Sequence, residues 1–284
     1  MPSLRDLRRR IRSVQNTQKI TKAMELVAAA RMRRALERVL AARPYSDEIT
    51  SIMTELMKRT PEYKHPFLER REVRRRIIIL VTADRGLAGA LNSNNNRLAL
   101  REMNDSDVPV AVITIGRKGR DIMRRLHKDL IADRSDLGPR PSLGDVLPAV
   151  RVATDQYESG DADQVDLVFA RYISASRQQA TLRRLIPVDP PEGAAPAAAD
   201  FEYEPEAKDV LDALLPRYVE ALVYQAVLEN VASEQAAKRL AMHNASDNAN
   251  DLIIDLTLTA NKVRQSQITT ELMEIVGGAT ALEG

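Results

Sequence analysis

The sequence of 284 residues contains no cysteine, no tryptophan and only three histidines. Without cysteine the chain has no disulfide bonds, no thiol catalysis and no cysteine-ligated metal site. The histidines, His65, His127 and His243, are scattered, and none has a second ligand at metal-binding spacing. No run of about 18 apolar residues occurs, which is the length that a membrane-spanning helix requires. These absences exclude several classes of enzyme and membrane protein.

Helix-breaking residues are almost missing from both ends of the chain. After Pro216 there is no further proline, and the next glycine is Gly277. The stretch to Gly284 therefore predicts a single helix of roughly 100 Å, at about 1.5 Å per residue. A second helical pattern extends from Leu4 to about Leu56, with a break expected only at Pro44. A domain of this size cannot cover so long a helix, so we expect the two terminal helices to pack on each other.

The N-terminal helix carries a coiled-coil repeat, in which seam residues alternate at three- and four-residue steps. The register comprises Leu4, Leu7, Ile11, Val14, the polar Gln18, Thr21 and Glu25, and then Ala28, Met32, Ala35, Val39 and Ala42. Through the polar part, the apolar stripe shifts to Ile20, Met24 and Val27. Such a shift predicts a local change in supercoiling.

The C-terminal helix carries two adjacent stripes. The first contains Ile254, Leu258, Ile268, Leu272 and Ile275, with Asn261 and Gln265 at the polar steps. The second contains Leu228, Val231, Met242, Ala245, Ala249, Leu252, Leu256 and Val263. Two stripes predict contacts over a wide arc of the helix. The last stretch, residues 273–282, is nearly uncharged, so we expect a partner to surround this apolar tip.

The formal charge of +2 conceals an asymmetry between the two helices. Up to Arg43 there are twelve Lys and Arg against three acidic residues, whereas from Pro216 onward there are five against nine. Opposite charges favour pairing of the helices with each other. The arginine clusters fit either a solvated helix face or a surface that an acidic partner contacts. No helix-turn-helix, zinc finger or aromatic platform accompanies them, so we expect no nucleic-acid partner.

The middle of the chain changes to the pattern of an α/β body. Short apolar runs predict strands at residues 76–81, 108–116, 165–173 and 179–188, the last two as antiparallel neighbours. Helices are expected after the first strand up to about Met103, at 117–130 and at 141–158. The predicted fold class is a Rossmann-like α/β body inserted between the two helices of a long antiparallel coiled coil. The predicted domains are residues 1–60, 75–190 and 206–284, with a Pro/Ala/Glu-rich connector at 187–205.

A nucleotide site in this body is the main enzymatic hypothesis. The turn at residues 86–89 lies where a phosphate-binding loop would lie, but it matches neither the dinucleotide nor the P-loop pattern. Asp84, at a strand end, is either catalytic or a structural residue that caps the next helix or pairs with Arg85. No serine lies in a nucleophile elbow. We therefore expect no catalytic residue, no cofactor and no metal.

Several motifs, in the same order along the whole chain, resemble the gamma subunit family of the rotary ATP synthase. They are residues 11–14 and 18–24, the Thr82–Leu87 stretch with Gly89 and Asn92, and the C-terminal run from Ala241 to Leu272 that ends in 274–279. The resemblance implies an antiparallel coiled coil that enters a ring of three alpha and three beta subunits. It also implies that the body lies on the membrane c-ring together with the epsilon subunit. Catalysis would belong to the beta subunits, and this chain would couple rotation to them at the cytoplasmic face of a bacterial plasma membrane, as a peripheral subunit.

The same resemblance implies the residues that meet the partners. For the alpha and beta subunits these are Lys22, Met24, Arg264, Gln265, Ile268, Ile275 and Val276. Arg264 and Gln265 would be hydrogen-bonding catches against beta-subunit loops, and Lys22 would face acidic beta-subunit segments. Tyr203 and Glu204 would lie near the c-ring and epsilon. For each residue, ordinary coil packing or solvation is the competing interpretation.

Two other functions stay open from the residues alone. One is an α/β nucleotide-binding enzyme that is oligomerised by its long helices, for which a ligand should stabilise the isolated chain. The other is an arginine-rich coiled-coil protein that binds nucleic acid, with an affinity that falls steeply with salt.

Overall fold

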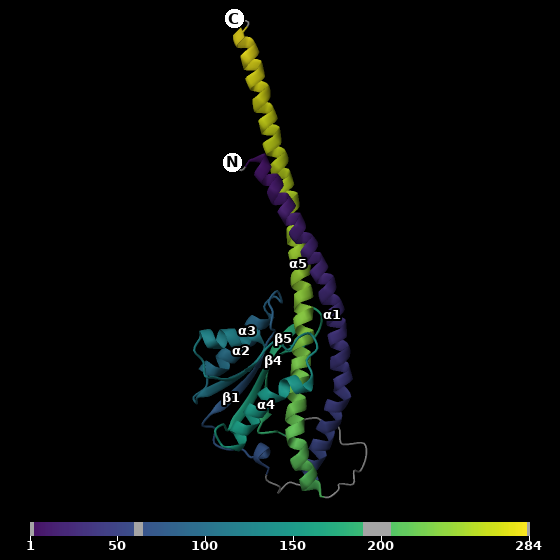
Figure 1. Cartoon of the computed structure of the whole chain (residues 1–284), viewed down its shortest axis with the longest axis vertical. Coiled ribbons are helices and arrows are strands. Elements are labelled where there is room, and N and C mark those ends of the chain that lie inside the picture. The colour runs from purple at the N-terminus through teal and green to yellow at the C-terminus, as the bar shows by residue number, and fades with distance from the viewer. Residues whose placement is uncertain (1–2, 60–64, 190–205, 283–284) are drawn as a thin grey trace. The chain divides into compact units, whose positions relative to one another are not determined.

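The computed structural model describes residues 3–59, 65–189 and 206–282 (Figure 1). They separate into two compact units, one formed by the residues up to Val27 together with those from Arg239 onward, the other by Ala28–Lys238. The two long helices, α1 (Leu4–Arg59) and α5 (Ala207–Leu282), contribute residues to both units. The domain boundaries expected from the sequence stay a prediction.

The second unit contains a five-stranded sheet with the order β3-β2-β1-β4-β5. Its elements are β1 (Arg76–Val81), α2 (Leu91–Asn104), β2 (Val110–Ile115), α3 (Arg117–Arg125), β3 (Leu130–Arg134), α4 (Leu143–Glu158), β4 (Gln164–Tyr172) and β5 (Gln178–Ile186). A short 3-10 helix, η1 (Pro66–Leu68), precedes β1. The first four strands in the sheet are parallel, and β5 is antiparallel to β4 as predicted.

The central strand β1 is buried on both faces of the sheet, because its apolar side chains alternate between two hydrophobic clusters. Ile77 and Ile79 belong to the larger cluster, which includes residues of α1, α4 and α5. Ile78 and Leu80 belong to the smaller one, which lies against α2 and α3. The sheet therefore separates two helical layers.

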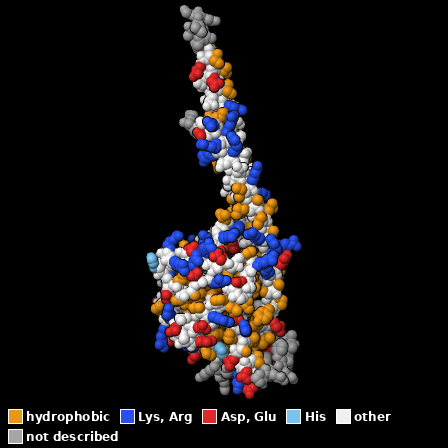
Figure 2. Space-filling model, viewed as in Figure 1, with side chains coloured by type: hydrophobic (Ala, Val, Ile, Leu, Met, Phe, Trp, Pro, Cys, Tyr) orange, Lys and Arg blue, Asp and Glu red, His pale blue; other side chains and the backbone are white. Residues whose placement is uncertain are grey.

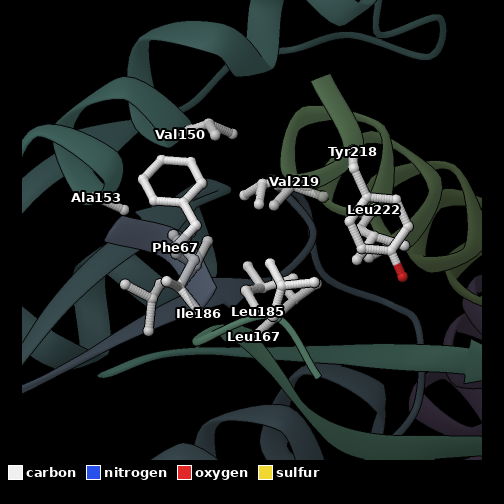
Figure 3. Close-up of a cluster of buried hydrophobic side chains, with 14 of the residues drawn as sticks. Phe67, Val150, Ala153, Leu167, Leu185, Ile186, Tyr218, Val219 and Leu222 are labelled. Atoms are coloured by element: carbon white, nitrogen blue, oxygen red, sulfur yellow. The ribbon is translucent and has the colours of Figure 1, made fainter. Parts of the chain in front are cut away.

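Aromatic and aliphatic side chains from several elements meet in the larger cluster (Figure 3). Phe67 of η1 is fully buried and packs edge to face on Tyr157 of α4, with ring centroids 6.1 Å apart. From α5, Tyr218, Val219 and Leu222 contribute to the same cluster. Since the cluster joins sheet, α4 and α5, burial of these apolar groups stabilises all three together.

Four details differ from the sequence-based expectation. The helix expected at 117–130 ends at Arg125, and the chain then forms β3, which was not predicted. The C-terminal helix begins at Ala207 and includes Pro216, because the preceding Leu211 and Leu215 are fully buried in the larger cluster. The predicted break at Pro44 is wrong. Helix α1 continues through it although a proline inside a helix costs about 3 kcal/mol.

Buried residues on either side of Pro44 explain why the helix continues. Val39 packs with Leu228 of α5, and Ile49 belongs to the larger cluster. Between them, the Ser46 hydroxyl donates a hydrogen bond of 2.7 Å to Oε1 of Gln225. Packing on both flanks therefore offsets the local cost of the missing backbone hydrogen bond.

In the first unit the two helices pair in opposite directions. Leu7 packs with Leu256 and Ala260, and Gln18 donates a hydrogen bond of 3.4 Å to Oδ1 of Asn250. Farther along α1, Glu25 lies 3.4 Å from Nδ1 of His243. Numbers rise along α1 as they fall along α5, so these pairings are antiparallel.

The predicted seam of α1 is confirmed, but the predicted shift of its apolar stripe is wrong. In the first unit, Thr21 is only 8% exposed, whereas Ile20 and Val27 are 60% and 50% exposed. The helix keeps the three-and-four register through its polar residues, since turning Ile20 and Val27 inward would break the register on both sides. Two apolar side chains are thereby left on the surface.

Candidate functional site

The N-terminal start of α1 determines which part of α5 is covered in the first unit. Helix α1 begins after Ser3, whose hydroxyl accepts a 3.2 Å hydrogen bond from the Asp6 backbone N–H and donates one of 2.7 Å to the Asp6 carboxylate. These two hydrogen bonds cap the start of the helix. The first residues of α1 pack with α5 as far as Val263. From Arg264 to Val276 every residue of α5 is exposed, and we call this stretch the α5 end segment.

Arg264 opens the α5 end segment. Within the part of the chain that the structure describes, its guanidinium has neither a hydrogen bond nor an ion pair, with Glu271 or with any other residue. The carbonyl of the neighbouring Gln265 accepts a 3.0 Å hydrogen bond from the Thr269 hydroxyl. The side chains of Arg264 and Gln265 are thus exposed without intramolecular polar partners among the described residues.

Apolar side chains accompany this arginine along the first of the two predicted stripes. The stripe comprises Ile254, Leu258, Asn261, Gln265, Ile268, Leu272 and Ile275, and all of these residues are exposed. Ile268 and Ile275 are 49% and 67% exposed, and Val276 beside them is 59% exposed. Apolar side chains are visible along this end of α5 in Figure 2. A regular apolar stripe without cover is a typical protein-binding surface.

The second predicted stripe faces α1 in part. Met242, Ala249 and Leu256 are buried, whereas Leu252 is 38% exposed and does not belong to the contact. Among the described residues, the second stripe is therefore partly covered within the chain, whereas the first stripe is exposed.

Lys22 lies in a polar cluster that joins α1 and α5. Its Nζ is 3.0 Å from Glu25 Oε2, and the other Glu25 oxygen faces His243, whose Nε2 is 3.4 Å from Asp247. The hydrogen bond from Lys22 is the largest cause that lowers the pKa of Glu25, while burial opposes it. More than half of the Lys22 side chain is still exposed, and Met24 is half-buried. Lys22 can thus present a positive charge while it holds Glu25.

A groove between the two helices lies next to this cluster. Its lining residues are Gln18, Lys19, Lys22, Ser246, Asp247, Asn250 and Asp251. Lysines on one side and aspartates on the other give the groove a mixed charge.

Asp84 has a structural position in the body. Its Oδ1 accepts a 2.9 Å hydrogen bond from the Arg117 backbone N–H at the start of α3, and its Oδ2 accepts one of 3.2 Å from the Leu137 N–H. Both oxygens are committed to backbone donors. Asp84 thus has a structural role, but the predicted capping of the next helix is wrong, because Asp84 binds the start of α3 and not that of α2.

The crevice in which doubly wound folds bind nucleotides lies between β1 and β4, where the strand order reverses. In this chain, side chains of α2 and α5 occupy the carboxyl ends of these strands. Asn95, Asn230 and Ser233 are all buried there and hydrogen-bonded to strand backbone. The chain itself thus fills the usual ligand position.

The described residues contain no group of three or more acidic, His or Cys side chains that could hold a metal ion. None of the described helices is both long and apolar enough to cross a membrane. Tyr203 and Glu204, predicted near the c-ring, lie outside the described residues.

The α/β body of one unit and the paired helices of the other, with an exposed apolar segment on α5, define the class: an α/β protein with long terminal helices. Solved structures share the fold. A chain of the Euglena gracilis mitochondrial ATP synthase in rotational state 3 has a TM-score of 0.68 at 21% identity, covering 98% of this chain and 94% of the other. A chain of the Tetrahymena thermophila mitochondrial ATP synthase central stalk and c-ring has a TM-score of 0.62 at 24% identity, covering 80% and 99%.

Sequence comparison gives the particular family. The family model described as ATP synthase matches residues 3–282. The ATP synthase gamma chain of Herpetosiphon aurantiacus is 50% identical over 99% of both chains, and that of Dehalococcoides mccartyi strain CBDB1 is 46% identical over 99% of this chain and 100% of the other. The chain belongs to the ATP synthase gamma chain family, which confirms the resemblance found in the sequence.

Proposed function

We propose that this chain is the central rotor shaft of a proton-translocating ATP synthase. It couples rotation of a membrane c-ring to conformational changes at the catalytic sites of the beta subunits. The observation that carries the proposal is the α5 end segment, a helix surface with exposed apolar side chains and an arginine that has no ion pair or hydrogen bond among the described residues. Membership of the gamma chain family supports it.

In this proposal α1 and α5 form an antiparallel coiled coil. The antiparallel pairings of the first unit and the buried three-and-four register of α1 support this arrangement. Three alpha and three beta subunits would surround the α5 end segment. Exposed apolar side chains on the segment would form an apolar contact surface, or bearing, on which the helix can rotate without breaking directional bonds.

The contacts to the alpha and beta subunits are proposed at the residues that the resemblance implies. On α5 they are Arg264, Gln265, Ile268, Ile275 and Val276, all of which are exposed. On α1 they are Lys22 and Met24. Arg264 and Gln265 would act as catches, because a guanidinium donates to a carboxylate in a planar, bidentate geometry. For Tyr203 and Glu204, contact with the c-ring and epsilon is proposed from the resemblance alone.

The chain is proposed to be non-catalytic, peripheral to the membrane and at its cytoplasmic face. The alternative of a nucleotide-binding enzyme is disfavoured because the chain's own Asn230 and Ser233 occupy the switch-point crevice. Calorimetric titration of the isolated chain with MgATP separates the two. We expect no heat of binding, and micromolar affinity would favour the enzyme.

The direct test is co-expression of the chain with alpha and beta subunits of one synthase. We expect a stable complex that hydrolyses ATP, in which a probe attached to the body of this chain rotates during turnover. A matched chain that ends after Val263 lacks the α5 end segment and should assemble less well. A complex that turns over ATP while the attached probe stays still would refute the rotor function.

A further inference from the structure

The carboxyl end of β4 extends beyond its parallel neighbour. The paired register of β1 and β4 ends at Leu80 and Val168, whereas β4 continues to Tyr172 and pairs there only with β5. Ala170 lies in this extension, and its backbone groups on the β1 side have no strand to meet. Buried backbone groups of this kind are costly unless another donor and acceptor replace the strand.

Side chains of helix α5 replace the missing strand. The Ala170 N–H donates a 3.2 Å hydrogen bond to Oδ1 of Asn230, and the Ser233 hydroxyl donates one of 2.9 Å to the Ala170 carbonyl. Asn95 of α2 donates to the same Asn230 oxygen at 3.1 Å and to the Val81 carbonyl, the last of β1, at 2.9 Å. We call these four groups, Asn95, Ala170, Asn230 and Ser233, the β4-end network.

The network is closed to water and closely surrounded. Asn95 and Ser233 are fully buried, and Asn230 is 2% exposed. Small side chains border it, since Ala170 packs in one cluster with Ala88 and Ala237. Along α5, no residue from Tyr218 to Lys238 is exposed. The helix is thus enclosed on all sides where it meets the strand ends.

Apolar packing alone does not fix how a helix is rotated about its axis, because the hydrophobic effect is non-directional. Hydrogen bonds have strict distance and angle requirements. A turn of α5 by one residue position, about 100°, would move Asn230 away from both donors. It would leave the Ala170 N–H and an Asn95 N–H buried and unpaired.

We infer that the β4-end network, with Asn230 at its centre, locks the rotational position of α5 against the α/β sheet and so transmits torque between the body and the helix. The part of this inference that concerns torque rests on the proposed rotor function. Asn230 is a positioning residue, since it acts through α5 and touches no partner in this role.

The first experiment is independent of rotation and uses hydrogen exchange of the isolated full chain. Asn230→Leu keeps the branched shape and the number of heavy atoms but removes the acceptor, and Asn230→Asp keeps an oxygen for both donors. Val112→Ala is the control, because Val112 is fully buried in the cluster on the opposite face, which contains no α5 residue. We expect the Ala170 amide to exchange about tenfold faster in Asn230→Leu than in the control, with Asn230→Asp between them.

Equal protection of Ala170 in Asn230→Leu and the control would overturn the locking role. If Asn230→Leu fails to fold, Ser233→Ala takes its place, because it removes only the donor to the Ala170 carbonyl. Unchanged exchange around Ala170 in that variant would overturn the inference as well.

The second experiment uses the complete ATP synthase in vesicles and compares proton pumping with ATP hydrolysis. We expect Asn230→Leu to lower the number of protons pumped per ATP at least about twofold, with Val112→Ala close to the wild type. Faster exchange with an unchanged pumping ratio would refute torque transmission by the network. Failure of the wild-type chain to couple at all would refute the proposed function instead, while the exchange result would stand.

Discussion

Replacing Arg264 by alanine separates a contact with a partner from a contribution to folding. In the described part of the chain its guanidinium forms no ion pair or hydrogen bond, and the side chain lies beyond the start of α1. Surface substitutions without such contacts change the free energy of unfolding by less than about 0.5 kcal/mol. We therefore expect Arg264→Ala to leave the melting temperature of the isolated chain unchanged.

In the assembled head the expected effect is much larger. A hydrogen bond to a charged group contributes about 1.5–3 kcal/mol when it is shielded from water. If the Arg264 bond forms only in the transition state of the rate-limiting rotation step, its loss slows ATP turnover about 10- to 150-fold. Adding Gln265→Ala should slow turnover further, because its amide is exposed on the same segment.

Steady-state ATP hydrolysis by the purified head measures this effect, with assembly checked by size-exclusion chromatography. Lys262→Ala is the matched control, since it removes the same charge from a nearby exposed position on a different side of the helix. Equal slowing by both variants would show that net charge matters rather than a directed bond. Wild-type turnover of a fully assembled Arg264→Ala head would refute the proposed hydrogen bond between Arg264 and a beta subunit.

Three further predictions concern the tip, the body and the polar cluster. Deleting residues 277–284 should weaken torque or assembly only moderately in single-molecule rotation, because an apolar bearing has no directional bonds; complete loss of rotation in an assembled complex would contradict this. Gly116→Ala should lower the free energy of unfolding by more than about 2 kcal/mol in urea denaturation, since its φ is +108° and a Cβ would lie 2.1 Å from the Thr82 carbonyl oxygen. Gly138→Ala, with φ +69° but open space, is the control, and an equal loss would remove the clash as the cause. Because the folded-state pKa of Glu25 is lowered, its ion pair stabilises the fold above the unfolded pKa and loses this effect as pH falls through the folded pKa. Glu25→Gln should therefore lower the melting temperature at pH 7, and the difference from the wild type should shrink as the pH falls, whereas a difference that stays constant would exclude the charge.

The buried strands of the body could be predicted because each is a short, nearly continuous run of apolar residues. Arg76–Val81 is a short run rich in β-branched residues and forms β1 with the predicted bounds. Strand β3 was missed because Leu130–Arg134 lies at the sheet edge and is only half-buried, so its sequence lacks a strong apolar period. The seam of α1 was predictable from spacing, whereas the burial of Thr21 in place of Ile20 depends on the register of the whole helix.

The surface could be predicted only in part. The two stripes of α5 were visible in the sequence, but which one is covered depends on where α1 begins and how it faces α5. Likewise, that Arg264 has no polar partner among the described residues follows from the last contact of α1 at Val263. The β4-end network had no sequence signal, because asparagine and serine inside a helix are usually solvated and only the tertiary fold brings Asn230 to a strand end.

The unbroken register of α1 restricts how the length of this protein can vary. Each residue added to a helix turns everything beyond it by about 100°. A single insertion between Leu4 and Leu56 would therefore expose the buried seam on one side of the change, whereas an insertion of seven residues, two turns, would nearly restore it. The alignments with relatives extend over 284 to 301 positions. We expect this variation to lie in loops, so that gaps in an alignment of relatives would outline the helices as clearly as any pattern of apolar residues.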